Sequence, residues 1–331
     1  MPGVVLVTGR NGVGKTNLLE ALHVGSQGFS PRTRAEPRLV RFGEATARVR
    51  LAGEEAKTPF ETEVDVEPAA PKRIKLNGAL LASGDELRLR LSALAFTPDR
   101  LAVVKGGPIV RRAYLDRMLG RLFPARAKLP SDYGRALSQR NAALRRVRGG
   151  ESSRDALEPW TEQVATLGAS LDRSRAELAT ALAPGFSEHA EGLGLAGAEI
   201  AYVEEGLTTG GLAARLDRDI ERGTTGLGPH LRDAAITAAG RDLRAFGSQG
   251  EQRTAVLALV LAEADLLAER RGEPPLLLLD DVFSELDSAR GEALVARLPV
   301  GGQTVVTATE QPVALRPDLV VSVTTGEARV A

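Results

Sequence analysis

Cysteine is absent from the 331 residues of this chain. Its absence excludes disulfide bonds and metal centres held by thiolates. The chain also lacks any apolar run of about 18 residues, the length that a membrane-spanning helix needs. Its start, Met1-Pro2-Gly3, carries none of the positive side chains of a secretory signal peptide. We therefore expect a cytoplasmic protein without a membrane partner.

Aromatic residues and net charge are scarce as well. Phe, Trp and Tyr form 4% of the chain, and 43 basic residues balance 43 acidic ones to a formal net charge of zero. A neutral protein has no global attraction to nucleic acid, and few aromatics disfavour binding of single strands by base stacking. A nucleic-acid site would therefore have to come from a local cluster of basic side chains.

What the chain does contain, near its start, is a glycine-rich segment. Residues 9–16, Gly-Arg-Asn-Gly-Val-Gly-Lys-Thr, fit the P-loop pattern and lie between the apolar run 4–7 and the helix-like segment 17–22. The glycines allow backbone N–H groups to converge on phosphate oxygens at a helix N-terminus. Lys15 adds charge at the β- and γ-phosphates, and the Thr16 hydroxyl can ligate Mg²⁺. The predicted ATP-binding residues of this loop are Asn11, Gly12, Gly14, Lys15, Thr16 and Asn17.

An aliphatic run that ends in two carboxylates lies far downstream. Residues 275–279 read as a buried parallel strand, and Asp280 and Asp281 follow it directly. Ligands bind at the carboxyl ends of strands in open α/β sheets, so we expect these acids beside the P-loop. Asp280 is the predicted Mg²⁺ ligand together with Thr16, and Asp281 is predicted to polarise an attacking water. The alternative is a core strand closed by two solvated acids.

A third motif opens an apolar helix just upstream of that strand. Residues 246–253, Phe-Gly-Ser-Gln-Gly-Glu-Gln-Arg, resemble the signature loop of ABC-type ATPases. Ser248 and Gly250 would there form a second phosphate site at a helix N-terminus. Residues 284–287, Ser-Glu-Leu-Asp, follow the two acids Asp280 and Asp281, at the place where ABC proteins carry their D-loop. Taken alone, Ser248 could simply cap a helix. The predicted catalytic residues are Lys15, Ser248 and Asp281.

The order of these motifs predicts the domain organisation. Because the ATP motifs must meet in one site, residues 1–105 and 195–331 are expected to form one α/β head with a mixed sheet. Residues 106–194 are expected to form an inserted helical arm domain, with Pro184-Gly185 as the signal for the exit from the arm. Periodicity and turn signals predict strands at 47–51, 60–66, 72–78, 91–96, 200–203 and 304–309, and helices at 131–148, 157–182, 212–222 and 290–298.

Basic residues gather in the first half of the predicted arm. The segment from Arg111 to Arg148 contains eleven basic and two acidic residues, a local net charge of +9. Such a stripe is typical of binding to the phosphate backbone of duplex DNA, with little sequence specificity. The alternative is a solvated helix face that the acids of the next helix balance. The predicted DNA-binding residues are Arg111, Arg112, Arg145, Arg146 and Arg148.

Together the motifs resemble the RecF family of bacterial recombination mediators, in the SMC-like branch of ABC ATPases. The resemblance is carried by residues 9–21, 96–99, 105–108, 111–112, 115–116, 228–230, 248–253 and 277–287. It implies an ABC-type head with ATP and Mg²⁺ as cofactors and a weak, DNA-dependent ATPase activity. It also implies an ATP-driven head-to-tail homodimer on duplex DNA and single-strand/duplex junctions, released by slow hydrolysis. RecR and RecO-like proteins, which help to load recombinase, are the implied partners.

The chain departs from the family pattern at several points. RecF proteins usually carry a further strand and a Tyr-Arg-Asn-like segment before the P-loop, which here begins at residue 9. Arg10 stands where the family often has an acid. No histidine follows residues 305–310, where transporter ATPases place a switch histidine, so Thr309 or Glu310 would substitute for it or hydrolysis would be slow. His230 is either a family-specific residue or a hydrogen-bonded turn histidine.

Two other functions remain open at this point. One is the ATPase subunit of an ABC transporter, which the missing switch histidine and the basic arm argue against. The other is a truncated RecF-like protein that does not hydrolyse ATP, which the short segment before the P-loop suggests. Measured ATP turnover would discriminate between the second alternative and an active ATPase.

Overall fold

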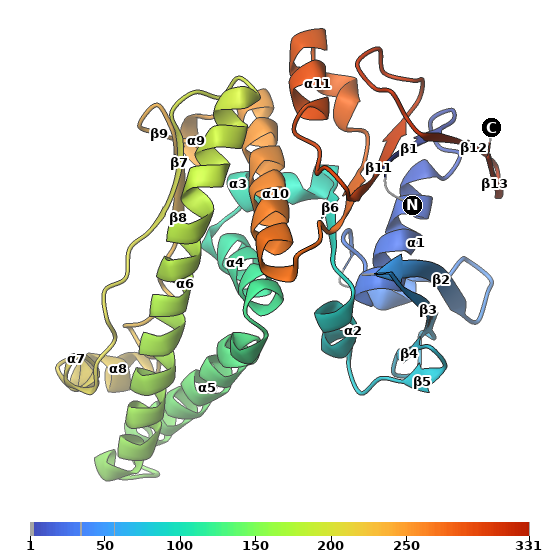
Figure 1. Ribbon diagram of the computed structural model, residues 1–331. Helices are drawn as coiled ribbons and strands as arrows, with labels where there is room; N and C mark the ends of the chain where they lie inside the picture. The colour runs from blue at the N-terminus through green and yellow to red at the C-terminus, as the bar shows by residue number, and fades with distance from the viewer. Residues whose placement is uncertain (1–2, 34, 56, 331) are drawn as a thin grey trace. The chain divides into compact units, whose positions relative to one another are not determined.

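The structure is a computed structural model that describes residues 3–33, 35–55 and 57–330 (Figure 1). The chain forms two compact units. The head unit comprises Met1–Leu101, Gly185–Ala196 and Gly247–Ala331, and the arm unit comprises Ala102–Pro184 and Gly197–Phe246. None of the helices in these described ranges combines the length and apolar character that a membrane span requires.

A six-stranded sheet forms the centre of the head unit. Five of its strands are parallel and the edge strand β13 is antiparallel, in the order β13-β12-β1-β11-β10-β6. The mixed sheet therefore confirms the predicted fold class. Its strands are β1 (Gly3–Thr8), β6 (Ala93–Phe96), β10 (Leu276–Leu279), β11 (Gln303–Ala308), β12 (Leu319–Thr324) and β13 (Glu327–Val330).

Apolar residues on the sheet pack against the helix that follows β1. Helix α1 (Lys15–Gln27) places Leu19 in one cluster with Val7 of β1, Leu278 of β10 and Val305 of β11. Because β1, β10 and β11 are parallel neighbours, Thr8, Leu279 and Ala308 all end at the same edge of the sheet. This edge carries the segments that the sequence analysis singled out.

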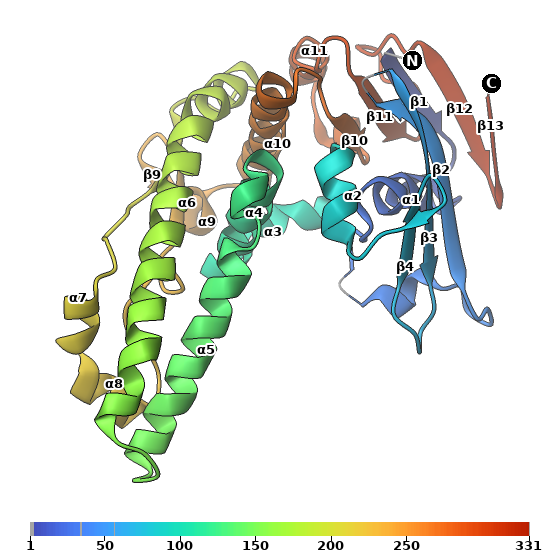
Figure 2. The same ribbon diagram turned by 60° about the horizontal axis from the view of Figure 1, so that its bottom comes forward.

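A second, antiparallel sheet completes the head unit (Figure 2). Val24 of α1 packs there against Val64 and Ile74, so one helix serves both cores. The Asn77-Gly78 turn adopts positive φ at both residues, as the hairpin signal predicted. The strands are β2 (Ala47–Glu55), β3 (Thr58–Val66), β4 (Arg73–Leu76) and β5 (Ala79–Leu80). The other helices of the head are η1 (Glu36–Leu39), α2 (Gly84–Arg90), η2 (Pro98–Leu101), α10 (Gln249–Arg271), η5 (Val282–Glu285) and α11 (Ser288–Val295).

The arm unit consists of helices and a small three-stranded sheet, β7-β8-β9. Its two longest helices, α5 (Leu129–Arg148) and α6 (Glu158–Gly192), run side by side (Figures 1 and 2). The remaining elements are α3 (Ala102–Lys105), α4 (Pro108–Leu122), η3 (Pro124–Arg126), η4 (Arg154–Leu157), β7 (Ala198–Tyr202), α7 (Thr209–Ala213), α8 (Leu216–Arg222), β8 (Ala234–Ala238), β9 (Arg241–Asp242) and α9 (Leu243–Phe246).

Residues 197–246 belong to the arm unit, whereas we expected them in the head. Buried long-range contacts explain the difference. Arg140 of α5 is fully buried and donates to Asp219 of α8 at 2.9 Å and to Thr225 at 2.7 Å. A buried charge needs such partners, so α8 and the loop after it are tied to α5. The predicted helix 212–222 is also split into α7 and α8.

The first segment of the arm unit ends at Pro184 and the head unit resumes at Gly185, as expected for the exit from the arm, but α6 itself continues to Gly192. A proline inside a helix removes one hydrogen bond and usually kinks or ends the helix. Here Phe186 and Ala190 are fully buried beyond it. A Cβ at residue 185 would lie 3.4 Å from the Ala262 Cβ, so Gly185 lets α6 pack closely on α10. This packing outweighs the unfavourable local preference.

Candidate active site

The P-loop joins β1 to α1 at the shared edge of the sheet. Gly12 and Gly14 have φ of 83° and 111°, values that L-residues rarely adopt. A Cβ at either position would meet no atom within 4 Å, so the backbone turn and not crowding requires glycine there. Helix α1 has no acidic residue in its first turn and no side-chain cap at Gly14. Its N-terminus therefore keeps the positive end of its dipole for an anion.

Lys15 carries its charge inside this loop. The side chain is largely buried, and Nζ donates to the carbonyls of Gly9 at 2.6 Å and Arg10 at 3.2 Å. These two hydrogen bonds hold the Lys15 ammonium group against the backbone of the P-loop. A compact point charge in this position suits a phosphate oxygen. The loop thus combines a cation with a helix N-terminus.

Thr16 and Asp280 meet, although they lie 264 residues apart in the chain. The Thr16 hydroxyl donates to Asp280 Oδ1 at 3.1 Å, and the Thr307 hydroxyl donates to the same oxygen at 2.7 Å. Asp280 is almost fully buried at the end of β10. A hydroxyl and a carboxylate side by side form a pair of hard oxygen donors, which fits Mg²⁺ when phosphate oxygens and water complete its shell. The described residues contain no cluster of three or more His, Cys, Asp or Glu that would bind a metal without such help.

Asp281 follows in an uncommon backbone conformation. Its φ of 49° and ψ of 38° place a non-glycine residue in the left-handed region, at a cost of about 1–2 kcal/mol. Thr307 Oγ1 accepts from the Asp281 N–H at 2.9 Å, and Arg253 donates to the Asp281 carbonyl at 2.7 Å. Its exposed carboxylate has no ion pair or hydrogen bond with another described side chain. These contacts hold the backbone and leave the carboxylate free for a substrate or a water molecule.

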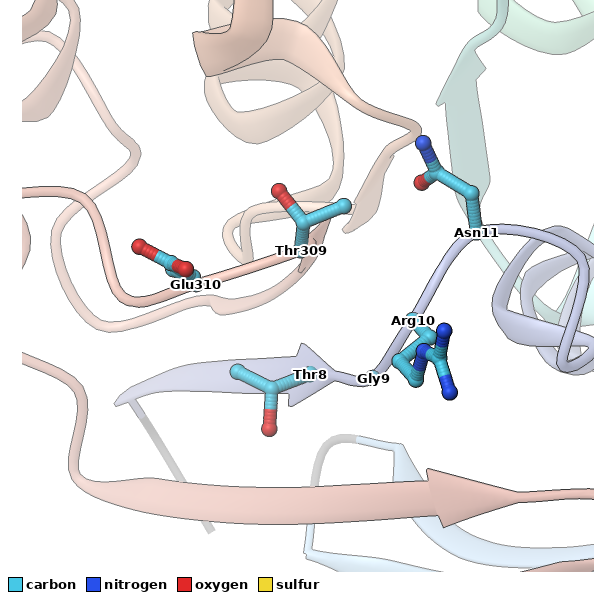
Figure 3. A pocket seen from close by; sticks show the side chains of 6 residues that line it. All are labelled: Thr8, Gly9, Arg10, Asn11, Thr309 and Glu310. Carbon is cyan, nitrogen blue, oxygen red and sulfur yellow. The ribbon is translucent and has the colours of Figure 1, made fainter.

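An open cavity of about 560 Å³ lies beside the P-loop (Figure 3). Residues 8–11 line it from the P-loop, and Thr309 and Glu310 line it from the segment after β11. Sites for small ligands typically measure about 300–1,000 Å³, so the size suits a nucleotide. Thr309 and Glu310, the expected substitutes for a switch histidine, therefore line the same cavity as the P-loop.

Ser248 begins α10 in the head unit and is exposed to solvent. Its hydroxyl accepts from the Glu251 N–H at 3.2 Å, and its own N–H donates to Glu251 Oε2 at 2.7 Å. This reciprocal pair of hydrogen bonds is a capping box. Ser248 therefore caps α10, as the alternative interpretation of this residue expected. Gly250 in the same turn is exposed as well. The cap uses the N–H groups of Ser248 and Glu251 and places the negative charge of Glu251 in the first turn of α10, while Ser248 and Gly250 stay exposed to solvent.

His230 is a structural residue of the arm unit. Its Nδ1 lies 2.6 Å from the Tyr133 hydroxyl and its Nε2 lies 3.0 Å from the Thr225 carbonyl. The carbonyl can only accept, so Nε2 donates and Nδ1 accepts from Tyr133. Burial lowers the pKa of His230 and raises the pKa of Tyr133, which favours this neutral pair. The structure therefore supports the interpretation of His230 as a hydrogen-bonded turn histidine.

The predicted DNA-binding arginines fall into two groups. Arg111 is 5% exposed, pairs with Asp233 and donates to the carbonyls of Val104 and Gly106. The prediction that Arg111 contacts DNA is therefore wrong, since all three guanidinium nitrogens donate hydrogen bonds within the arm unit. Arg112 is half-buried and donates to the Arg232 carbonyl at 2.7 Å. In contrast, the residues at the end of α5 are exposed: Arg145, Arg146 and Arg148.

Three comparisons place the chain among known proteins. Residues 1–331 match the model of the RecF/RecN/SMC N terminal domain family. The DNA replication and repair protein RecF of Anaeromyxobacter dehalogenans is 39% identical, over 94% of this chain and 87% of that protein. The corresponding protein of Myxococcus xanthus is 38% identical, over 92% of this chain and 84% of that protein.

Solved structures give the same assignment. The structure of the recombination mediator protein RecF with ATP, from the RecFOR pathway, aligns with a TM-score of 0.88 at 32% identity and covers 100% of this chain and 92% of that one. An Smc head domain of Pyrococcus furiosus aligns with a TM-score of 0.56 at 18% identity, over 99% of this chain and 89% of that one, and supports the fold alone. By its sequence and by its structure, the chain belongs to the RecF family.

Proposed function

We propose that this chain is an ATP-dependent DNA-binding protein of DNA replication and recombinational repair. The observation that carries the proposal is the contact between Thr16 of the P-loop and Asp280 at the end of β10. It joins a phosphate-binding loop to a buried carboxylate at the sheet edge, as ATP hydrolysis requires. Relatives that are 36–39% identical carry the name DNA replication and repair protein RecF.

The residues of the site have separate roles in the proposed reaction. The N-terminus of α1 and Lys15 bind and neutralise the phosphates, while Thr16 and Asp280 would hold Mg²⁺. The cation, when bound, would stabilise charge that develops on the phosphate oxygens. Asp281 orients and polarises the water that attacks the γ-phosphate. Because no histidine follows β11, we expect slow turnover unless Thr309 or Glu310 takes the role of a switch residue.

The first test removes the charge of the P-loop. Lys15→Met should weaken ATP binding at least about tenfold, because a hydrogen bond to a charged group contributes about 1.5–3 kcal/mol. Titration with a fluorescent ATP analogue measures the affinity. Lys57→Met, which removes a lysine from the turn between β2 and β3, is the matched control and should bind normally. Equal affinity of Lys15→Met and wild type would refute the assignment of the P-loop.

DNA is the proposed partner of the exposed arginines on the arm unit. Arg145, Arg146 and Arg148 lie in the last turn of α5. Arg148 reaches the Glu221 carbonyl at 3.4 Å, so the end of α8 lies beside them. The exposed residues of α8 are of both signs, Asp217, Arg218, Glu221 and Arg222, so the basic surface is assigned to the end of α5 alone. Glu177 of α6 pairs with Arg126, so it neutralises an earlier residue of the basic stripe and not the exposed end of α5.

Neutralising Arg145, Arg146 and Arg148 to Gln should weaken binding to duplex DNA and flatten its salt dependence. Each phosphate contact contributes about one unit to the slope of log affinity against log salt, so the slope should fall by about three. Fluorescence anisotropy at several salt concentrations measures it. The triple variant Arg38→Gln, Arg41→Gln, Arg244→Gln makes the same change at exposed positions elsewhere and should keep the wild-type slope. Equal slopes for all three proteins would assign the α5 arginines to a solvated face.

Dimerisation, the preferred DNA and the protein partners extend the proposal. The exposed start of α10 suits a nucleotide held by a second copy of the chain, which would give an ATP-dependent homodimer. Single-strand/duplex junctions and RecR- and RecO-like proteins are proposed as partners because a similar structure belongs to the RecFOR pathway. Binding of purified RecR- and RecO-like proteins to the DNA-bound dimer tests this part. The RecF resemblance does not favour a transporter subunit, and measured ATP turnover would exclude a non-hydrolysing relative.

A further inference from the structure

Arg253 links the signature helix to the loop that carries Asp281. It lies in the second turn of α10 and is only 6% exposed. Its Nη2 donates to the Asp281 carbonyl at 2.7 Å, and its Nη1 pairs with Glu285 Oε2 at 2.7 Å. The guanidinium also lies 5.6 Å from the centroid of the Phe96 ring at the end of β6. One side chain of α10 therefore holds both ends of η5, the short helix after Asp281.

The Asp281 carbonyl to which Arg253 donates belongs to a residue with a strained backbone conformation. Asp281 occupies the left-handed region, which L-residues adopt only where surrounding contacts stabilise it. Thr307 holds the N–H of this residue and Arg253 holds its carbonyl. These two hydrogen bonds fix the orientation of the peptide planes on either side of the Asp281 Cα. They therefore also fix the direction in which the carboxylate leaves the backbone.

Only an arginine can make this arrangement from a single position on α10. Its planar fork presents several donors in fixed directions, so separate nitrogens reach Asp281 and Glu285 at once. A lysine in the same place would carry the charge but could not hold both acceptors in this geometry. Arg253 also connects the helix that begins at Ser248 to Asp281, the proposed hydrolytic residue of the same head unit.

We propose that Arg253 is a positioning residue for hydrolysis: from the second turn of α10 it holds the Asp281 peptide, and so directs the Asp281 carboxylate toward the water that attacks the γ-phosphate. This inference rests on the proposed ATPase function and adds a residue that orients Asp281 within the same head.

The test is Arg253→Lys in the full chain. Nucleotide should bind normally, because the P-loop, Thr16 and Asp280 are untouched. At saturating ATP, kcat should fall at least about tenfold while KM stays within about twofold of the wild-type value. Arg271→Lys is the matched control: Arg271 lies on the same helix and also donates to a carbonyl, that of Arg88 at 3.1 Å. It should hydrolyse ATP as the wild type does.

A second variant, Glu285→Gln, separates the ion pair from the carbonyl contact. It removes the charge that orients one side of the Arg253 fork and leaves the donor to Asp281 in place. Its kcat should therefore lie between those of wild type and Arg253→Lys. Thermal unfolding of each variant reports whether the head remains folded.

Failure of this inference can be distinguished from failure of the proposed function. A wild-type protein without ATP turnover contradicts the proposed function and, with it, this inference. Normal wild-type turnover combined with an equal kcat of Arg253→Lys overturns the inference alone. A parallel loss of ATP affinity, melting temperature and kcat in Arg253→Lys also overturns it, because Arg253 would then only stabilise the head.

Discussion

Asp281→Asn should bind ATP with wild-type affinity and hydrolyse it hardly at all. Asn has the shape of Asp and is among the residues that tolerate the left-handed region, so the backbone at φ 49° and ψ 38° should persist. The amide cannot accept a proton from the attacking water. A positioned general base typically contributes about 10²–10⁴-fold to a rate. We expect phosphate release at saturating ATP and Mg²⁺ to fall by a factor in that range.

Two further variants define what this result means. Asp85→Asn makes the same chemical change on the head, at an exposed residue that pairs with Arg88, and should leave turnover unchanged. Asp281→Ala also lacks the carboxylate but places alanine in the left-handed region, so it should lower the melting temperature as well. Wild-type turnover by Asp281→Asn would show that another group activates the water.

The contact between Thr16 and Asp280 could be predicted from the sequence alone. The P-loop and the aliphatic run before Asp280 each indicate a strand that ends in functional residues. In a parallel sheet both ends lie at one edge, so the two motifs had to meet there. The structure adds Thr307, whose buried hydroxyl binds Asp280 and the Asp281 N–H. A threonine within the aliphatic strand 303–308 belongs to no motif, and only the register of β11 beside β10 brings it to the acids.

The basic stripe shows where charge patterns fail. The sequence counts positive side chains but does not reveal which of them fold inward. Arg111 and Arg140 are buried in the arm and bound to acids that lie 122 and 79 residues away. Such distant partners could not be identified without the fold. The exposed end of α5 was predictable by contrast, because Arg145 and Arg148 stand before a glycine-rich turn at a helix terminus, where arginines commonly remain in solvent.

Ser248→Arg should abolish both ATP-dependent dimerisation and hydrolysis while ATP still binds to the monomer. The exposed turn at Ser248 and the P-loop each offer a helix N-terminus to phosphate. In an ABC-type dimer each nucleotide bridges the P-loop of one subunit and the signature turn of the other. Two such bridges would form a two-fold interface that contains the ligand, so ATP would stabilise the proposed dimer by mass action.

An arginine at position 248 would place bulk and a long side chain where the partner's nucleotide must approach. It would also remove the cap of α10, at a cost of about 1 kcal/mol, so Ser248→Ala is needed to measure the effect of losing the cap alone. Ser131→Arg introduces the same side chain at an exposed position of the arm and should dimerise normally. Light scattering with and without ATP reads the mass of each protein directly. An ATP-dependent doubling of mass in Ser248→Arg equal to that of wild type would contradict the bridged dimer, and so would a wild-type mass that ignores ATP.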